Sequence, residues 1–305
     1  MKVTIIVFSP TGNTLKVARM LTDNLSNNGF QVQLMDITRT GKLFLEKCYK
    51  NFLDENVEKH DLLMMGSPVY AHHMHYNMLD VIKSLPKVDE KWSKLAVPFI
   101  TYGGISSGIT LYEAAKILRK TGRTVVLGMK INAFHVMSRI LSTDQNKGMP
   151  GEEAMPFIQE MTYRITGMLT NPCKDITKEL DYQNTKSKIK AKLIFREKLW
   201  QDHFYPKLKH NEALCTGCSK CVSPCPVQRL ELKDGRILMG TNGVACIHCT
   251  QCVYVCPVNA LYFECDKAKW DKLFNKAVSG KGPLPSNEKP KSAVYPLEFP
   301  YTIQY

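Results

Sequence analysis

Eight of the eleven cysteines in this chain stand in two runs with the same spacing, C-x2-C-x2-C-x3-C-P. The first three thiolates of such a run can bind three irons of one cubic cluster. The fourth, displaced by the longer gap and the proline, reaches the other cluster. The spacing therefore predicts two [4Fe–4S] clusters. The predicted ligand sets are Cys215, Cys218 and Cys221 with Cys256, and Cys246, Cys249 and Cys252 with Cys225.

Two other roles for the cysteines compete with this interpretation. A disulfide framework is typical of short secreted chains in an oxidising compartment, and this chain of 305 residues is neither short nor visibly secreted. Zinc sites prefer two separated C-x2-C pairs or mixed cysteine and histidine sets, instead of three cysteines at successive three-residue steps. We interpret the cysteines outside the runs, Cys48, Cys173 and Cys265, as ordinary thiols.

Residues 210–265 resemble the bacterial two-cluster ferredoxins, because both cysteine runs match their motif in full. Each run is followed by a short apolar segment, at residues 228–232 and 260–264, so that the region is an internal repeat. The resemblance implies a small α+β domain that carries both clusters.

The first half of the chain alternates between apolar runs that are typical of buried strands and segments with apolar residues at helical spacing. We expect strands at residues 3–8, 30–36, 61–66, 95–101 and 123–131, with a helix after each. This alternation predicts an α/β fold with a doubly wound, five-stranded parallel sheet that is covered on both faces. Pro98 lies inside the fourth strand, which predicts a bulge there or a later start of the strand.

Three distinctive loops follow the first, third and fourth strands, at residues 9–14, 67–71 and 101–108. Because ligands of such sheets bind outside the carboxyl ends of the strands, these loops predict one binding site. The first loop joins a strand to a helix and is rich in hydroxyl groups, so its N–H groups and hydroxyls can hold a phosphate at the helix N-terminus. The sequence has neither the G-x-x-x-x-G-K loop of nucleoside triphosphate sites nor a G-x-G-x-x-G dinucleotide motif at this position.

Residues 1–169 resemble the flavodoxin family, whose phosphate loop Ser/Thr-x-Thr-Gly-Asn-Thr is matched by residues 9–14. The resemblance implies FMN, with its phosphate on the first loop and its isoalloxazine between the other two, near Tyr70 and Tyr102. The residues that it assigns to FMN are Ser9, Thr11, Gly12, Asn13, Thr14, Ser67, Pro68, Val69, Tyr70, Thr101, Tyr102, Gly103, Gly104 and Gly108.

A histidine cluster, His72, His73 and His75, departs from the flavodoxin pattern. It could bind a metal, line the flavin pocket as a proton donor, or lie on the surface at the start of a helix. Residues 132–151 form a long connection that could be a lid or a docking surface.

The net charge of +13 is unevenly distributed, and between residues 173 and 210 ten basic residues face five acidic ones. A solvated connecting helix, an acidic redox partner and nucleic acid each account for such charge, but no nucleic-acid motif accompanies it. The expected organisation is a flavodoxin-like domain over 1–169, a basic and partly helical linker over 170–209, a two-cluster domain over 210–265 and a proline-rich tail over 266–305. No apolar run is long enough to span a bilayer, so we expect a cytoplasmic protein, and the clusters suggest an anaerobic setting.

The two halves together predict an iron–sulfur flavoprotein that transfers low-potential electrons between two [4Fe–4S] clusters, FMN and an external redox partner, for which an acidic protein such as a ferredoxin is favoured. The alternative is an FMN-dependent reductase of a quinone, nitro compound or enone, which is supplied by its own ferredoxin module. The sequence leaves open whether the chain is an enzyme or a carrier. A homodimer is expected if the flavin and the clusters of one chain lie too far apart.

Overall fold

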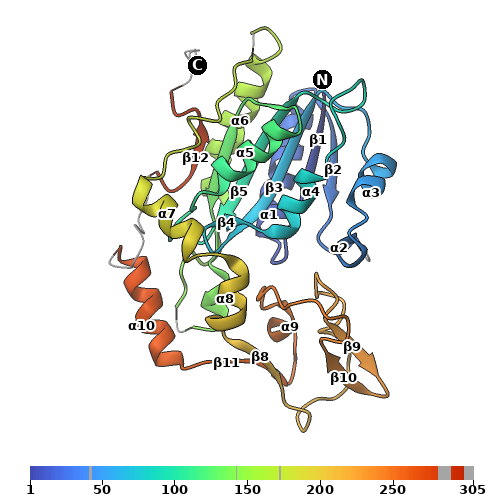
Figure 1. Ribbon diagram of the computed structural model, residues 1–305, viewed down its shortest axis with the longest axis vertical. Coiled ribbons are helices and arrows are strands. Elements are labelled where there is room, and N and C mark those ends of the chain that lie inside the picture. Colours follow the sequence, from blue (N-terminus) through green and yellow to red (C-terminus); the bar gives the residue numbers. More distant parts are fainter. Residues whose placement is uncertain (41–42, 142, 172, 281–289, 299–305) are drawn as a thin grey trace.

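The computed structural model describes residues 1–40, 43–141, 143–171, 173–280 and 290–298. Figure 1 shows a sheet with helices on both faces in the upper part and the cysteine-bearing region in the lower part. The strands of the sheet point their carboxyl ends toward the lower part, so any ligand of the sheet lies between the two.

The central sheet has the strand order β12-β7-β5-β3-β1-β2. Neighbouring strands pair in parallel, except that β12 joins β7 in the antiparallel sense. The bounds are β1 (Lys2–Val7), β2 (Gln31–Asp36), β3 (Leu62–Tyr70), β5 (Leu95–Tyr102), β7 (Gly128–Asn132) and β12 (Ala293–Tyr295). A two-residue strand β4 (His73–Met74) pairs with β3. The predicted α/β fold with its doubly wound parallel sheet is confirmed.

The proline in the fourth predicted strand leaves that strand intact and interrupts its neighbour. β5 continues through Pro98, which pairs with Met65 of β3. On the other side of β5, β6 (Thr124–Val125) and β7 pair with it as two separate strands. Between Ala96 and Phe99 of β5, the neighbouring chain has one extra residue, because these two residues pair with Val125 and Met129. Because proline has no N–H to donate, the ladder is weakest at this point. The expected bulge therefore lies opposite the proline.

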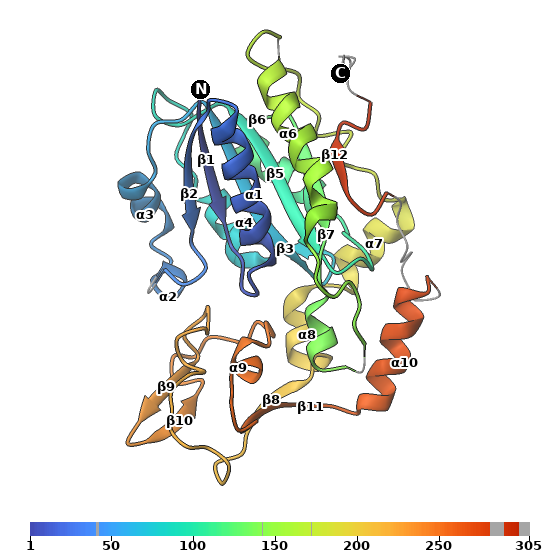
Figure 2. The ribbon, with the colours of Figure 1, turned by 180° about the vertical axis from the view of Figure 1, so that it is seen from behind.

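Helices cover both faces of the sheet, as Figures 1 and 2 show from opposite sides. Apolar residues of α1 and α6 recur at helical spacing and join the core on one face. Residues of α3, α4 and α5 form the core on the other face. The bounds are α1 (Asn13–Asn27), α2 (Leu43–Glu46), α3 (Tyr49–Asn56), α4 (Tyr76–Lys83), α5 (Thr110–Lys120), η1 (Val136–Arg139), η2 (Glu152–Ala154) and α6 (Met155–Gly167).

A segment with two helices connects the sheet to the cysteine-bearing region, which contains two small antiparallel strand pairs. The apolar segments that were expected after the two cysteine runs form β9 and β11. The bounds are α7 (Thr185–Leu193), α8 (Glu197–His203), β8 (Lys207–His210), β9 (Leu230–Lys233), β10 (Arg236–Met239), α9 (Gln251–Tyr254) and β11 (Leu261–Glu264). Within the described ranges, no helix has the length and apolar character that crossing a bilayer requires.

The segment that the sequence predicts to be a proline-rich tail includes regular structure. Its first residues form α10 (Lys267–Val278), which was not anticipated, and its extended part adds β12 to the sheet edge. The tail residues Pro283, Pro285, Phe299, Pro300, Tyr301 and Tyr305 lie outside the described residues.

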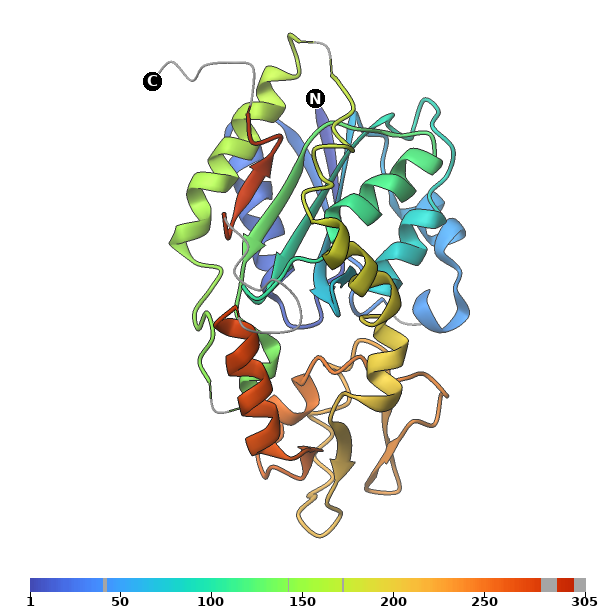
Figure 3. The same cartoon turned by 60° about the vertical axis from the view of Figure 1, so that its left-hand side comes forward.

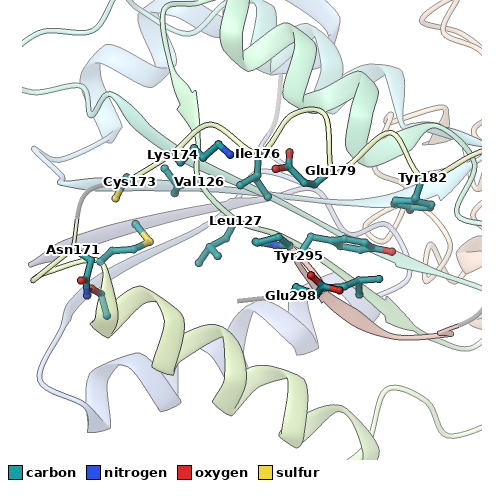
Figure 4. Close-up of a pocket in the computed structure, with 14 residues that line it drawn as sticks. Val126, Leu127, Asn171, Cys173, Lys174, Ile176, Glu179, Tyr182, Tyr295 and Glu298 are labelled. Atoms are coloured by element: carbon teal, nitrogen blue, oxygen red, sulfur yellow. The ribbon is translucent and has the colours of Figure 1, made fainter. Parts of the chain in front are cut away.

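A cavity of about 580 Å³ opens where β6 and β7 are interrupted. Figure 4 places Val126 and Leu127 of that interruption, Cys173 of the connecting segment and Tyr295 of β12 around it. No residue that is predicted to hold FMN or a cluster lines this cavity, so it is separate from the site described below.

Candidate redox site

The loop after β1 has the geometry of a phosphate site. Gly12 adopts the left-handed conformation with φ 90°, which glycine reaches without strain, and the chain turns there into α1. The Ser9 hydroxyl accepts a hydrogen bond from the Leu15 N–H at 2.9 Å and fixes the turn. The backbone N–H groups of Thr11, Asn13 and Thr14 donate to no acceptor among the residues that the structure describes. These groups at the helix N-terminus fit an anionic phosphate.

The loops after β3 and β5 lie beside this turn, as predicted. Thr14 and Thr101 share a hydrogen bond of 2.7 Å between their buried hydroxyl groups, which ties the first loop to the third. The Gly103 backbone packs directly against the His135 ring, so that a side chain at this position would overlap the ring. Gly108 has φ 59° and approaches the His72 carbonyl group equally closely. Both glycines are therefore required by close backbone approaches.

The three loops border two adjoining cavities. A narrow one of about 60 Å³ is lined by the phosphate loop and by the other two loops, from Thr11 to Val136. A larger one of about 420 Å³ shares six residues with it, and includes Tyr70, Gly103 and His135. Its farther wall is formed by α8, by α10 and by the second cysteine run. Figure 3 shows α8 and α10 below the carboxyl ends of the strands, on different sides of this region.

The larger cavity is called the aromatic cavity here, because rings dominate its farther wall. No carboxylate lies among its described lining residues, and the charged group that faces it is Lys269. A planar, apolar ring system matches such a lining. The aromatic residues of the farther wall are Phe195, Trp200, Phe204, Tyr205, Trp270 and Phe274.

The two tyrosines that the resemblance places near the flavin occupy different positions. Tyr70 lines both cavities and packs edge-on against the buried His75, with 4.8 Å between ring centroids. Tyr102 also lines both, but its ring lies beside the buried Lys130 and its hydroxyl donates to the Lys291 carbonyl at 2.6 Å. Both tyrosines therefore line the two cavities, but they are held there by different contacts.

The three clustered histidines do not converge on one point. His75 is fully buried and caps α4, because its Nδ1 accepts the Asn77 N–H at 3.2 Å. His73 contacts the Glu113 carboxylate at 3.1 Å and the Ala191 carbonyl at 3.0 Å through its two ring nitrogens. His72 packs edge-on against Phe195, with centroids 4.4 Å apart. Among the described residues, no group of three or more histidine, cysteine or acidic side chains is close enough to hold a single metal ion.

Burial keeps the rings near the cavities neutral. It lowers the pKa of His72 to about 3, with a smaller contribution from His73, and that of His75 to about 3. Burial likewise lowers the pKa of His135 to about 4. The Nδ1 of His135 accepts the Met137 N–H at 3.2 Å, so the proton of the neutral ring sits on Nε2. None of these three side chains is an imidazolium at pH 7, so they can donate hydrogen bonds but not acidic protons.

The cysteines form two groups that combine both runs. Cys215, Cys218, Cys221 and Cys256 line one small cavity, which we call the outer cysteine site. Cys225, Cys246, Cys249 and Cys252 line another, the inner cysteine site. The thiol of Cys221 interacts electrostatically with the other three of its group, and that of Cys252 does so in the inner group. These are the two sets that the spacing predicts.

The thiol chemistry of both sites fits iron–sulfur clusters. A cluster takes one thiolate at each iron corner, so its ligand sulfurs stand farther apart than those around a single ion. Burial raises the pKa of Cys249 to about 12, so that this sulfur is a thiolate only when a metal binds it. In the outer site Cys218 is exposed, and the Lys220 backbone N–H lowers the pKa of its thiol.

The inner site packs against the sheet-containing part. Cys249 belongs to the same buried apolar cluster as Phe8 and Met74, and His248, between two inner-site cysteines, lines the aromatic cavity. Arg139, in the long connection at residues 132–151, donates to the Gln251 side chain at 2.9 Å. Of the two roles expected for that connection, the structure supports docking. The aromatic walls and His248 were not predicted from the sequence, although the ring-rich stretch at residues 195–205 is a signal for such a wall.

Two family models match the chain at these two sites. One is described as NADPH-dependent FMN reductase and matches residues 1–135, and the other is described as a 4Fe–4S dicluster domain and matches residues 214–261. The chain is a flavodoxin-like domain joined to a 4Fe–4S dicluster domain. The resemblances of residues 1–169 to the flavodoxins and of residues 210–265 to the two-cluster ferredoxins are thereby confirmed, and FMN and 4Fe–4S clusters are the cofactors of these domain types.

Solved structures similar to the flavodoxin-like domain have low sequence identity. A flavodoxin from the domain Archaea is 17% identical, with 56% of this chain and 100% of that chain covered and a TM-score of 0.37. Oxidised flavodoxin 1 from Bacillus cereus is 16% identical, with the same coverage and a TM-score of 0.40. The apo form of an NADH:FMN oxidoreductase is 15% identical over 58% of this chain and 95% of that chain, with a TM-score of 0.40. A search of the curated proteins found no match.

Proposed function

We propose that the protein passes low-potential electrons between two [4Fe–4S] clusters and FMN, and exchanges them with an external redox partner. The observation that carries this proposal is the position of His248, which stands between Cys246 and Cys249 and lines the same cavity as Tyr70 and Gly103. When bound, the clusters carry electrons singly and the flavin carries one or two. The inner site and the flavin loops of one chain thus face each other, so transfer does not require a second copy.

The residues of the chain have separable tasks in this proposal. The free N–H groups of Thr11, Asn13 and Thr14 bind the FMN phosphate, and the loops at residues 67–71 and 101–108 hold the ring system. The aromatic walls exclude water from its edge. The inner cysteines lie next to these loops, and the outer cysteines lie nearer the solvent.

The outer cysteine site is the proposed contact for the external partner. Its Cys218 is exposed, whereas three of the eight cysteines in the two sites, Cys221, Cys249 and Cys252, are buried. Lysines on the nearby strand β8 and in the first cysteine run, Lys207 and Lys220, contribute to the positive charge of the chain. An acidic iron–sulfur protein fits this charge, and its encounter rate should fall as ionic strength rises.

Replacement of one inner ligand tests the proposal. Cys225→Ser removes a ligand of the inner site, although residue 225 belongs to the first cysteine run. Rapid anaerobic mixing with a reduced ferredoxin should then reduce the flavin at least tenfold more slowly than in the parent protein, while the outer cluster is still reduced. Iron content should fall by about half.

Cys265→Ser is the matched control, because that residue lines neither cysteine site, and it should leave both quantities unchanged. Flavin reduction at the parental rate in Cys225→Ser, with the inner cluster absent, would contradict the relay. NADPH in place of the ferredoxin tests the donor that the name of the matching family suggests.

A second function, reduction of a small planar acceptor, is favoured by the aromatic cavity. Two of its walls, α8 and α10, lie outside the residues that either family model matches. They would cover the edge of a flavin held by the three loops, which a carrier protein would leave open for docking. Turnover of a quinone such as menadione by the reduced protein, far faster than its oxidation by a ferredoxin, would favour the reductase over the carrier.

A further inference from the structure

Two arginines of the flavodoxin-like domain reach the inner cysteine site. Arg39 follows β2, and its guanidinium donates to the carbonyl of Pro10 in the phosphate loop and to that of Pro224 beside Cys225, both at 3.4 Å. It therefore joins the first flavin loop to an inner-site loop in a single side chain.

The second arginine makes a similar link from the connection at residues 132–151. Arg139 donates to the Gln251 side chain at 2.9 Å and to the Thr250 hydroxyl at 3.4 Å, between the inner-site cysteines Cys249 and Cys252. Its guanidinium lies 4.3 Å from the centre of the Tyr254 ring. A planar guanidinium suits such combined hydrogen bonding and stacking.

Positive charge is unequally divided between the two cysteine sites. Arg39 donates to the carbonyl beside Cys225, and Arg139 donates to the two side chains between Cys249 and Cys252. A third arginine, Arg229, lines the inner site itself. At the outer site the corresponding cation is Lys220, which lines the cavity with Cys218 and Cys221.

None of the three guanidiniums has a carboxylate partner within ion-pair distance among the described residues. Arg139 is half-buried, and burial is the largest cause that lowers its pKa. A partly desolvated cation without an anion is costly. Four thiolates that bind a cluster at the inner site supply the missing negative charge.

Burial and charge act in opposite directions on a cluster at the inner site. Reduction adds a negative charge, which a buried, apolar site disfavours. Nearby cations favour the reduced state and raise the reduction potential. Without the arginines, the more buried inner cluster would be harder to reduce than the exposed outer one, and electrons would not move inward.

We propose that Arg39 and Arg139 hold the reduction potential of the inner cluster above that of the outer cluster, so that an electron which enters at the outer site comes to rest beside the flavin loops. This inference rests on the proposed function, because it requires both clusters. It gives the relay an inward direction, and it assigns that direction to residues of the flavodoxin-like domain.

A redox titration of the intact protein, followed by electron paramagnetic resonance, tests the inference independently of turnover. In Arg139→Gln, the ratio of reduced to oxidised inner cluster at a fixed potential should fall about tenfold, which is 59 mV for a one-electron couple. The outer cluster should change by less than a third of this. Arg39→Gln should have a smaller effect in the same direction, because Arg39 is exposed and solvent screens it.

Two further variants separate charge from structure. Arg139→Lys keeps the charge and should restore most of the inner potential. Arg19→Gln removes an exposed arginine of α1 and should move neither potential. An unchanged inner potential in Arg139→Gln, or equal shifts of both clusters, would overturn the inference and leave the relay standing. A protein with fewer than two clusters would overturn both.

Discussion

The buried His75 contributes to the acid sensitivity of the flavodoxin-like domain, and replacement by asparagine should remove that contribution. His75 has no exposed surface and a pKa of about 3, against an ordinary value of 6.5. At pH 5 the folded side chain therefore binds almost no proton, while the unfolded one binds about one. As pH falls from about 6.5 toward about 3, the unfolded state binds a proton that the folded state does not, and it is stabilised. The stability that neutral His75 contributes to the folded state is therefore fully present only above about pH 6.5.

The size of this effect follows from the pKa difference. Each pH unit inside the window changes the free energy of unfolding by ~1.4 kcal/mol per group. The fall from pH 6.5 to pH 5 thus removes about 2 kcal/mol from the stability of the region that His75 caps. In His75→Asn, the side-chain amide oxygen can still accept a hydrogen bond from the Asn77 N–H at the start of α4, but the side chain at position 75 no longer binds a proton. The variant loses ring contacts with Phe8 and Tyr70 at every pH.

Hydrogen exchange of the α4 amides in the intact protein, at pH 5 and pH 7, measures this difference locally. Between pH 7 and pH 5, the free energy of local opening should fall in both proteins, and the fall should be about 2 kcal/mol smaller in His75→Asn than in the parent protein. The α1 amides in the same samples serve as the internal control, because His75 caps α4 and not α1. Their pH dependence should be the same in both proteins. The same pH dependence in both proteins would refute the low pKa of His75 as the cause.

Two further predictions concern the flavin loops and the aromatic cavity. Gly108→Ala should weaken FMN binding more than tenfold by fluorescence titration, because an added Cβ overlaps the His72 carbonyl group. Gly29 also has a positive φ, of 82°, but open space around it, so Gly29→Ala should leave FMN binding unchanged. Equal losses of FMN affinity in the two variants would show that backbone strain alone is responsible. Ala277→Phe places a ring in the aromatic cavity and should weaken menadione binding to the oxidised protein at least tenfold, as measured by calorimetry. Ala268→Phe, on the exposed side of the same helix, is its control. Equal menadione affinities in the two variants would argue against this cavity as the binding site.

Several features of the fold and the site were predictable because their determinants are local. The ligand sets follow from cysteine spacing, since three thiolates within seven residues can reach only one cluster. The phosphate loop follows from a strand, a short hydroxyl-rich turn and a helix in succession. The parallel sheet follows from the regular alternation of apolar runs and helical segments. The helix α10 was missed, because its proline-rich surroundings obscured a modest apolar pattern.

The amino-acid sequence by itself thus predicted which cofactors the two halves suit and which residues are candidates to hold them. Only the tertiary structure decided how the halves meet. Arg39 and Pro224 are 185 positions apart, and Arg139 and Gln251 are 112 apart, so no spacing or periodicity records their contact. The same holds for His248 and Tyr70, which line one cavity. Packing between distant segments, which depends on shape and burial rather than on local pattern, distinguishes the inner cysteine site from the outer one.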